Sequence, residues 1–174
     1  MLSFFWRRRP RTLWLTVVVA MIIADQISKA YFASTIALGN TIQVTEWFNL
    51  VHALNNGAAF SLFADANGWQ RPFLIGVSLL VIFPVTWVCI SKQVDPLERW
   101  IGSLVVAGGT GNLIDRIQTG AVVDFLDIHW RGLHWPAFNL ADIYVVSALL
   151  LWILLPLMLA VFKNSKRLKT EVKP

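Results

Sequence analysis

Long apolar runs, separated by polar and charged segments, form the main pattern of this sequence. Two of the runs, residues 72–90 and 143–162, contain no charged residue. Because roughly 20 helical residues cross a hydrocarbon core of about 30 Å, each run predicts a transmembrane helix. A third run, residues 100–114, is shorter and rich in glycine, alanine and serine. We expect it to belong to a helix that packs closely against its neighbours.

The first apolar run, residues 13–24, follows a group of arginines that begins at Arg7. Cleavable signal peptides also begin in this way, so the pattern alone leaves that alternative open. However, apolar residues resume after Asp25 and Lys29 and complete a span of about 20 residues. Asp25 and Lys29 are four positions apart, on one face of a helix, where their side chains can pair.

Together these runs predict an all-α integral membrane protein, a single domain of residues 1–174, with a small extracytoplasmic β-sheet or loop region. Four transmembrane helices are expected, at about residues 13–33, 71–90, 97–115 and 141–162. Eleven of the fifteen Lys and Arg residues lie in the terminal flanks and in the connection between the second and third helices. Because basic flanks stay in the cytoplasm, both termini are predicted to be cytoplasmic and the other two connections to lie outside.

The long connection between the first two predicted helices, residues 33–70, has two local patterns. Residues 41–45 alternate polar and apolar side chains, which predicts a half-buried strand with Ile42 and Val44 pointing inward. Asn55-Asn56-Gly57 is typical of a hairpin turn, because these residue types tolerate positive φ. The connection is therefore expected to contribute to a small sheet.

The composition agrees with membrane insertion. Apolar residues make up 56% of the chain and the mean hydropathy is +0.60, which argues against an ordinary water-soluble globule. A net charge of +5 would suit a nucleic-acid-binding protein, but the charges lie in clusters between apolar runs, as membrane topology requires. We therefore expect no nucleic-acid partner. The single cysteine, Cys89, excludes an intrachain disulfide framework and a cysteine-based zinc site.

Seven of the ten acidic residues lie within or beyond the outer half of the predicted helices, and carboxylates at a membrane boundary indicate function. The outer segments contain no Ser-His-Asp signature, and His52, His129 and His134 lack metal-ligand spacing, so neither a metal nor another cofactor is expected. Paired aspartates remain. Two carboxylates that share one proton can activate a water molecule and protonate a leaving amine, which is peptide hydrolysis without a cofactor.

The candidates for such a pair come from two outer segments. Residues 122–128 form a β-rich run with Asp124 and Asp127, which a strand would turn to opposite faces, so at most one of them enters a shared site. The second segment contains Asp142, which also has a purely structural interpretation. With Asn139 as N-cap, Asp142 occupies the third helical position of a capping box. Residue spacing alone does not decide between these interpretations.

Two other functional classes fit part of the pattern. In a small proton- or ion-coupled transporter, Asp25, Lys29, Asp124 and Asp142 would form a relay. A relay predicts carboxylates at different depths, whereas most of the acids here lie toward one boundary. A structural membrane subunit without chemistry is the third alternative, but it requires no long outer connection.

Five motifs occur in order along nearly the whole chain. With them, the sequence resembles the lipoprotein signal peptidase (signal peptidase II) family, aspartyl proteases of the bacterial cytoplasmic membrane. The motifs are Asp25-Gln-Ile-Ser-Lys29; Phe48-Asn49-Leu50-Val51 followed by Asn55-Asn56-Gly57-Ala58-Ala59-Phe60-Ser61; Gly108-Gly109-Thr110-Gly111-Asn112-Leu113-Ile114-Asp115-Arg116; Val122-Val123-Asp124-Phe125; and Phe138-Asn139-Leu140-Ala141-Asp142.

The resemblance implies that Asp124 and Asp142 are the catalytic pair, and it favours Asp124 over Asp127. It also implies that four polar residues around the site hold the substrate backbone or orient an aspartate: Asn55, Asn112, Arg116 and Asn139. Mainly structural roles are expected for three further motif residues: Asp25, Lys29 and Asp115.

The same resemblance implies the substrate, a prolipoprotein whose lipobox cysteine carries diacylglyceryl and which is cleaved just before that cysteine. The expected partners are lipidated prolipoproteins and membrane lipid. The expected location is the bacterial inner membrane, with the active site at the outer, periplasmic face, and we expect a monomer. The chain departs from the usual family pattern at residues 52–54, at Asn56 and at Ile143, which concerns contacts of the outer loop rather than the reaction.

Overall fold

The structure, a computed structural model, describes residues 11–57, 68–91 and 94–171, with side chains described as far as residue 157. Motif residues 58–61 and the arginines before Arg11 lie outside the described residues. In chain order the described elements are α1 (Arg11–Thr35), β1 (Thr41–Gln43), β2 (Phe48–Asn55), α2 (Gln70–Ser91), α3 (Pro96–Gln118), β3 (Val122–Trp130), β4 (Leu133–His134) and α4 (Leu140–Glu171).

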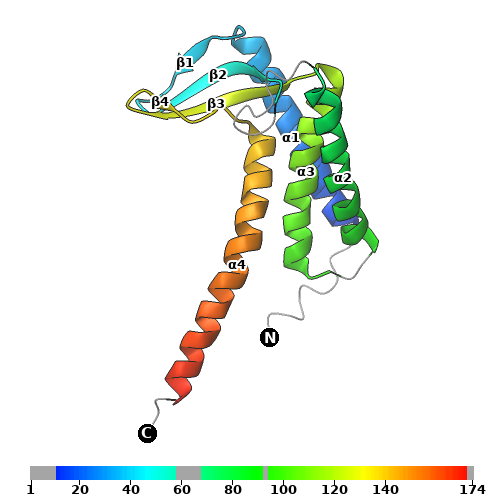
Figure 1. Ribbon diagram of the computed structural model, residues 1–174, viewed down its shortest axis with the longest axis vertical. Coiled ribbons are helices and arrows are strands. Elements are labelled where there is room, and N and C mark those ends of the chain that lie inside the picture. Colours follow the sequence, from blue (N-terminus) through cyan, green and yellow to red (C-terminus); the bar gives the residue numbers. More distant parts are fainter. Residues whose placement is uncertain (1–10, 58–67, 92–93, 172–174) are drawn as a thin grey trace.

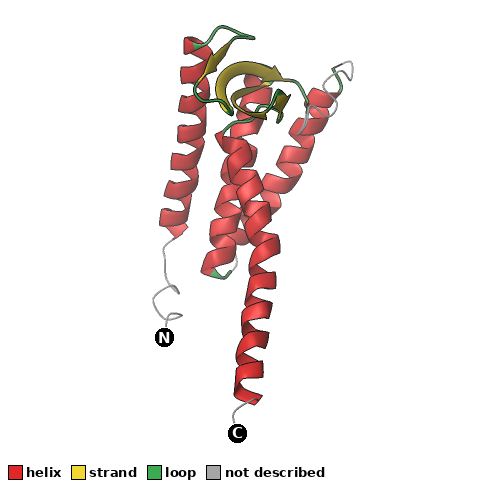
Figure 2. Cartoon of the chain, turned by 90° about the vertical axis from the view of Figure 1, so that its left-hand side faces the viewer, coloured by secondary structure: helices red, strands yellow, loops and turns green. Residues whose placement is uncertain are grey.

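The helices run roughly alongside one another, and the four strands lie together at one end of them (Figure 1). A view from the side shows the strands curving over that end (Figure 2). The first turn of α1 and the last turn of α4 lie toward the opposite end (Figure 1). The molecule therefore has a sheet end and a helix-only end.

The helices cover the four segments expected to be helical. Only α4 differs greatly, since it continues to Glu171 instead of ending near residue 162. The end of the apolar run predicts where the chain leaves the hydrocarbon core. The helix can continue beyond that point, because several of the following residues, lysine, arginine and leucine among them, favour helix. The start of α3 follows a clear local signal, because Asp95 caps it by accepting the N–H of Leu97 at 2.9 Å and Pro96 occupies the first turn.

A buried apolar cluster joins α1, α2 and α3 in the helical bundle. It contains Trp14 and Val18 of α1, Cys89 of α2, and Val106 and Ala107 of α3. The indole N–H of Trp14 also donates to the carbonyl of Arg99 on α3 at 3.0 Å. Helix α1 is thus a packed member of the bundle, which argues against the signal-peptide alternative.

Glycines on α3 allow α4 to approach closely, as the small residues of this segment predicted. A Cβ atom at Gly108 would meet the carbonyl oxygen of Ala141 and would lie 2.8 Å from Cγ2 of Val145. On another face of α3, a Cβ at Gly109 would lie 3.0 Å from Cγ1 of Ile82 on α2. The contacts at Gly108 fix the start of α4 against the middle of α3, and the contact at Gly109 brings α2 close to α3.

By length and composition, α1, α2 and residues 140–157 of α4 can each cross a membrane. Many of their large apolar side chains face away from the protein: Phe83 and Trp152, for example, are 75% and 69% exposed. Long apolar helices with such outward surfaces are typical of proteins whose solvent is the bilayer. The chain is therefore a multi-pass membrane protein with a small antiparallel sheet.

The sheet has the order β1-β2-β3-β4, with neighbouring strands antiparallel. Strand β2 pairs with β3 in a register that places Ala53 opposite Asp124 and Asn55 opposite Val122. The register shifts between Leu50 and Ala53, which marks a β-bulge. The shift brings the end of β2 alongside the part of β3 that carries Asp124.

Two predictions for this region are wrong. Ile42 and Val44 do not point inward, since they are 46% and 51% exposed. Strand β1 lies at the edge of the sheet, and its three residues are all exposed. Asn55 does not begin a hairpin between consecutive strands either, because β2 pairs with the preceding β1 and the distant β3. A tight local turn does form, in which Oδ1 of Asn55 accepts the N–H of Gly57 at 2.9 Å.

Candidate active site

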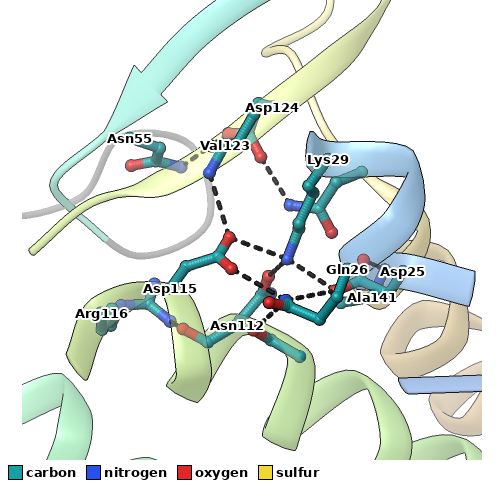
Figure 3. Close-up of polar contacts among 12 residues, drawn as sticks. Asp25, Gln26, Lys29, Asn55, Asn112, Asp115, Arg116, Val123, Asp124 and Ala141 are labelled. Carbon is teal, nitrogen blue, oxygen red and sulfur yellow. Dashed lines mark hydrogen bonds and ion pairs between the residues drawn. The ribbon is translucent and has the colours of Figure 1, made fainter. Parts of the chain in front are cut away.

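Two of the predicted aspartates meet where the sheet joins the helices. Asp124 lies on β3 and is 3% exposed, while Asp142 lies in the first turn of α4. Figure 3 shows Asp124 above the polar side chains that α1 and α3 contribute. The fold thus brings together two residues that are eighteen positions apart in the sequence.

Asp124 is held by two amide groups. Nδ2 of Asn139 donates to its Oδ1 at 2.6 Å, and Nδ2 of Asn55 donates to its Oδ2 at 3.2 Å. Asn55 comes from the end of β2 and Asn139 from the start of α4, so the donors approach from different elements. Their hydrogen bonds fix the orientation of the carboxylate in a buried position.

Asp142 has the geometry of the predicted capping box. Its backbone N–H donates to Oδ1 of Asn139 at 3.0 Å, and its Oδ2 accepts the backbone N–H of Asn139 at 3.2 Å. The other carboxylate oxygen, Oδ1, accepts Nδ2 of Asn112 on α3 at 2.8 Å. Capping and membership of the site are therefore not alternatives, because the same side chain satisfies both.

A second partner fixes the direction of each of the three amides. Lys29 can only donate, so it requires Oδ1 of Asn112 to face it, at 2.9 Å. Oδ1 of Asn139 accepts the N–H of Asp142, and Oδ1 of Asn55 accepts the N–H two residues further on. Every amide must then turn its NH₂ group toward a carboxylate. The site is thus built to supply donors to two negatively charged or half-protonated groups.

The protonation of Asp124 follows from this environment. Burial, and next the negative charge of Asp142, raise the pKa of Asp124 to about 7. The hydrogen bonds from Asn139 and Asn55 and the positive charge of Lys29 oppose the rise. Near neutral pH the Asp124 carboxyl is therefore partly protonated, which suits one member of a pair of aspartates that share a proton.

Arg116 supports the site from the last turn of α3. Its Nη2 donates to the carbonyl of Gly57 at 2.8 Å, and its Nη1 donates to the carbonyl of Asn112 at 3.4 Å. Within the described residues, its buried Nε has no hydrogen-bond partner. Arg116 thus holds the backbone that leaves β2, next to the amide of Asn55.

Asp25, Lys29 and Asp115 lie together below Asp124 (Figure 3). Nζ of Lys29 is 2.8 Å from Asp25 and 3.0 Å from Asp115, so the predicted pair with Asp25 is confirmed and a second acid joins it. Gln26, which sequence reasoning did not single out, donates to Oδ1 of Asp115 at 2.9 Å. Gln26 lies inside the Asp25-Gln-Ile-Ser-Lys29 motif, and this position could have marked it as a site residue.

Asp127, the alternative to Asp124, belongs to a different cluster. It is buried and accepts Nδ2 of Asn49 at 2.8 Å, and it lies 2.9 Å from Nδ1 of His134 on β4. The strand places it three residues beyond Asp124, on the other face, as its alternation predicts. Its partners tie β2, β3 and β4 together.

Comparisons with known proteins agree with this geometry. The family model described as "Signal peptidase (SPase) II" matches residues 17–158. A lipoprotein signal peptidase of Ralstonia nicotianae is 44% identical over 129 residues, covering 74% of this chain and 75% of the relative. One of Serratia marcescens is 44% identical over 140 residues, covering 80% of this chain and 81% of the relative.

Solved structures agree as well. A bacterial membrane enzyme determined by the in meso method at 2.3 Å resolution has a TM-score of 0.71 and 27% identity, covering 90% of this chain and 91% of that chain. A second, at 1.9 Å resolution, has a TM-score of 0.71 and 28% identity, covering 84% of this chain and 93% of that chain. The family match and the relatives do not favour the transporter alternative. The chain belongs to the signal peptidase II family of membrane proteases.

Proposed function

We propose that this protease removes the signal peptide from diacylglyceryl-modified bacterial prolipoproteins, cleaving just before the lipidated cysteine, with Asp124 and Asp142 as the catalytic pair. One observation carries the assignment of the pair. A buried aspartate, Asp124, and a half-buried one, Asp142, come from different elements and are held by amides whose NH₂ groups all face carboxylates. The signal peptidase names of the family and of the relatives support the substrate class.

In the proposed reaction, a water molecule lies between the two carboxyl groups and attacks the scissile carbonyl carbon. Asp142, whose negative charge the N-terminus of α4 favours, accepts a proton from the water as the new C–O bond forms. Asp124 carries the shared proton and gives it to the leaving nitrogen as the C–N bond breaks. The pair then holds one proton again, so the cycle needs no cofactor.

The surrounding polar groups have separate proposed roles. Asn55, Asn112 and Asn139 hold the two carboxylates at a fixed separation through the hydrogen bonds described above. Arg116 holds the Gly57 carbonyl and so sets the path of the chain beside the site. Because reaction rates depend steeply on how reacting groups are placed, these contacts matter for the rate even though they take no proton.

The proposed setting is the bacterial inner membrane, with all four helices, including α3, crossing it. The sheet and the catalytic pair would lie at the periplasmic face and both termini in the cytoplasm, as the distribution of basic residues predicts. The two ends of the bundle described above fit this orientation, since the first turn of α1 and the last turn of α4 share one end. The enzyme would act as a monomer, with its lipidated substrate and membrane lipid as partners.

The proposal is tested with purified protein and a lipidated prolipoprotein, with the products identified by mass spectrometry. The parent should release the signal peptide by cleavage just before the lipidated cysteine. Asp124→Asn and Asp142→Asn should each reduce kcat by about 1,000-fold or more, because each removes one half of the acid–base pair.

Asp127→Asn provides a matched control, since it changes another buried aspartate of the same strand that faces away from the site. It should retain cleavage within a few-fold of the parent at a temperature where it is folded. Near-normal cleavage by Asp124→Asn or Asp142→Asn would overturn the assignment of the pair. Absence of cleavage by the parent would overturn the proposed substrate.

A further inference from the structure

Lys29 forms the centre of a buried polar bridge that the proposed reaction does not use directly. Its ammonium group contacts Asp25 at 2.8 Å, Asp115 at 3.0 Å and Oδ1 of Asn112 at 2.9 Å. An ammonium has three N–H donors, so these three acceptors satisfy it completely. Lys29 is 3% exposed and Asp25 is fully buried. Figure 3 shows the group directly below Asp124.

The two acids of this bridge each hold the backbone next to a catalytic aspartate. Oδ1 of Asp25 accepts the N–H of Ala141, the residue before Asp142, at 2.9 Å. Oδ2 of Asp115 accepts the N–H of Val123, the residue before Asp124, at 3.2 Å. The same arrangement thus occurs twice, once at α4 and once at β3.

The bridge therefore joins the two halves of the site through one ion. Lys29 connects the acid that holds α4 to the acid that holds β3, and its third N–H orients the Asn112 amide that contacts Asp142. Gln26 strengthens the link, because its Nε2 lies 3.2 Å from Oδ2 of Asp25 and 2.9 Å from Oδ1 of Asp115.

We propose that the Asp25–Lys29–Asp115 bridge is a positioning device that sets the separation of the two catalytic carboxylates. The inference rests on the proposed roles of Asp124 and Asp142 and adds the residues that place them. Lys29 touches neither carboxylate, so it acts through the backbone at residues 123 and 141 and through Asn112.

The Asp25–Lys29–Asp115 bridge is better suited to positioning the backbone than to stabilising the fold. Buried ion pairs add little net stability, because the cost of removing charges from water offsets their attraction. A fully satisfied buried network does, however, define one geometry, because moving any member leaves a buried donor or acceptor without its partner. An arrangement of this kind joins α1, α3, β3 and α4 at the one place where the reaction needs a fixed distance.

The bridge also acts on the protonation of Asp124 through its charge. Within the described part of the chain, the charged groups that act on Asp124 are Asp142 from α4, Lys29 from α1 and Arg116 from α3. Of these, the negative Asp142 raises the pKa of Asp124 and the positive Lys29 lowers it. Removal of the ammonium should therefore raise the pKa of Asp124 further, which gives a second readout that simple destabilisation does not produce.

The test replaces Lys29 with methionine, a side chain of similar length that has no donor. In the prolipoprotein cleavage assay, Lys29→Met should reduce kcat by about 100-fold, the effect of a displacement of about 1 Å at a reacting group. KM should remain within about threefold, because Lys29 does not contact the substrate site. The alkaline limb of the profile of kcat against pH should move to higher pH, because loss of the ammonium should raise the pKa of Asp124.

Trp14→Phe is the matched control for lost packing between the same helices. It removes the hydrogen bond from the indole to the Arg99 carbonyl, which joins α1 and α3 far from the site. This variant should melt at a lower temperature than the parent, yet keep the parent's kcat and pH profile where it is folded.

Because Lys29→Met leaves two buried acids without their cation, a charge-balanced variant accompanies it. Lys29→Met with Asp115→Asn removes one charge of each sign, while Oδ1 of the new amide can still accept the N–H of Val123. This double variant should fold and still show the low kcat. A parental kcat in either folded variant would overturn the inference, and so would failure of both to fold, since the bridge would then be a folding element.

Asp124→Asn, measured in the same assay, separates this inference from the proposed function. If Asp124→Asn is inactive and the Lys29 variants are fully active, only the positioning role is overturned. If Asp124→Asn itself cleaves normally, the catalytic pair is wrong and the bridge has nothing to position.

Discussion

Asn139 takes part in two structures at once, the end of a helix and the proposed catalytic pair. Its Oδ1 accepts the N–H of Asp142 and so caps α4, while its Nδ2 donates to Asp124 at 2.6 Å. An amide can do both because it has one acceptor end and one donor end. A carboxylate at this position could only accept, and a serine hydroxyl is too short to cap α4 and also reach Asp124, so each would meet only the capping requirement.

Substitution at residue 139 should separate these two duties. Asn139→Ala should lower the free energy of unfolding by about 1 kcal/mol, the usual cost of a lost cap, whereas Asn139→Ser should nearly preserve it. Both variants should lower kcat by about 10-fold or more, because both lose a hydrogen bond to an ionisable carboxyl. Thermal melting in detergent and prolipoprotein cleavage measure the two effects. A fully active Asn139→Ser would contradict the role of the amide.

The pH dependence of cleavage should reflect the raised pKa of Asp124. Since that pKa is about 7, Asp124 loses its proton as the pH rises through neutrality, and the pair then has no acid for the leaving amine. At low pH both carboxyls are protonated and no base remains. A bell-shaped profile of kcat/KM is expected, with its alkaline limb near pH 7. A rate that stays flat through that limb would contradict Asp124 as the acid.

At this scale the motifs named candidate site residues, which the fold brings together, but they did not predict how the side chains are oriented. Motif order pointed to Asp124 and Asp142, and the capping-box spacing of Asn139 and Asp142 was correct. The direction of the Asn112 amide could not be predicted, because it depends on Lys29, 83 positions away in the chain. Gln26 was missed for the same reason, since its partner Asp115 is 89 positions away.

At the scale of elements, the site depends on how closely α4 approaches α3. The approach occurs at Gly108, where a side chain would collide with the backbone of Ala141, one residue before Asp142. Small residues at a helix interface allow such backbone contact in a membrane, where apolar surfaces alone do not drive association. The glycine therefore affects both helix packing and the position of the site.

Gly108→Ala should both destabilise the protein and reduce its activity. The added methyl group overpacks the α3–α4 contact, which typically costs about 1–3 kcal/mol, and it pushes the first turn of α4 away. Gly76→Ala on α2 is the matched control, because a Cβ there has no atom within 4 Å and a helical alanine gains about 0.5–1 kcal/mol over glycine. Melting temperatures and kcat of both variants give the comparison; equal stabilities would contradict the close contact.

The sequence predicted the helices better than the strands. Apolar runs of membrane-spanning length and the charges between them identified the four helical segments, because a bilayer imposes one length on all of them. Strand β2 was not predicted, since the run Phe48–Asn55 contains too few polar residues to alternate clearly. The inward direction predicted for Ile42 and Val44 was wrong because β1 lies at the edge of the sheet, which the alternation of residues 41–45 does not reveal.

At the scale of the whole molecule, the polar machinery lies at one end. The sheet, the pair of aspartates and the buried bridge all lie near the ends of α1 and α3 that meet the start of α4. The proposed orientation places this end at the periplasmic face, where it can meet exported substrates. The distribution of basic residues predicts this orientation for the whole molecule.

Cysteine labelling tests the orientation in cells. In a Cys89→Ala background, Leu133→Cys at the exposed β3–β4 turn should react with an impermeant thiol reagent added outside. Glu98→Cys, an exposed position near the start of α3 at the other end of the bundle, should react only after the inner membrane is permeabilised. The reverse labelling pattern would invert the topology.

The confinement of the polar contacts to the sheet end also has a consequence for the remainder of the helices. Residues 149–154 of α4 are consecutive exposed apolar residues, so this part of the helix is apolar on all sides, and the contacts described for the proposed catalytic groups lie in the first turn. The distal helical turns can therefore be lengthened, shortened or tilted to match bilayers of different thickness at modest cost. Adaptation to a new membrane would then leave the chemistry unchanged.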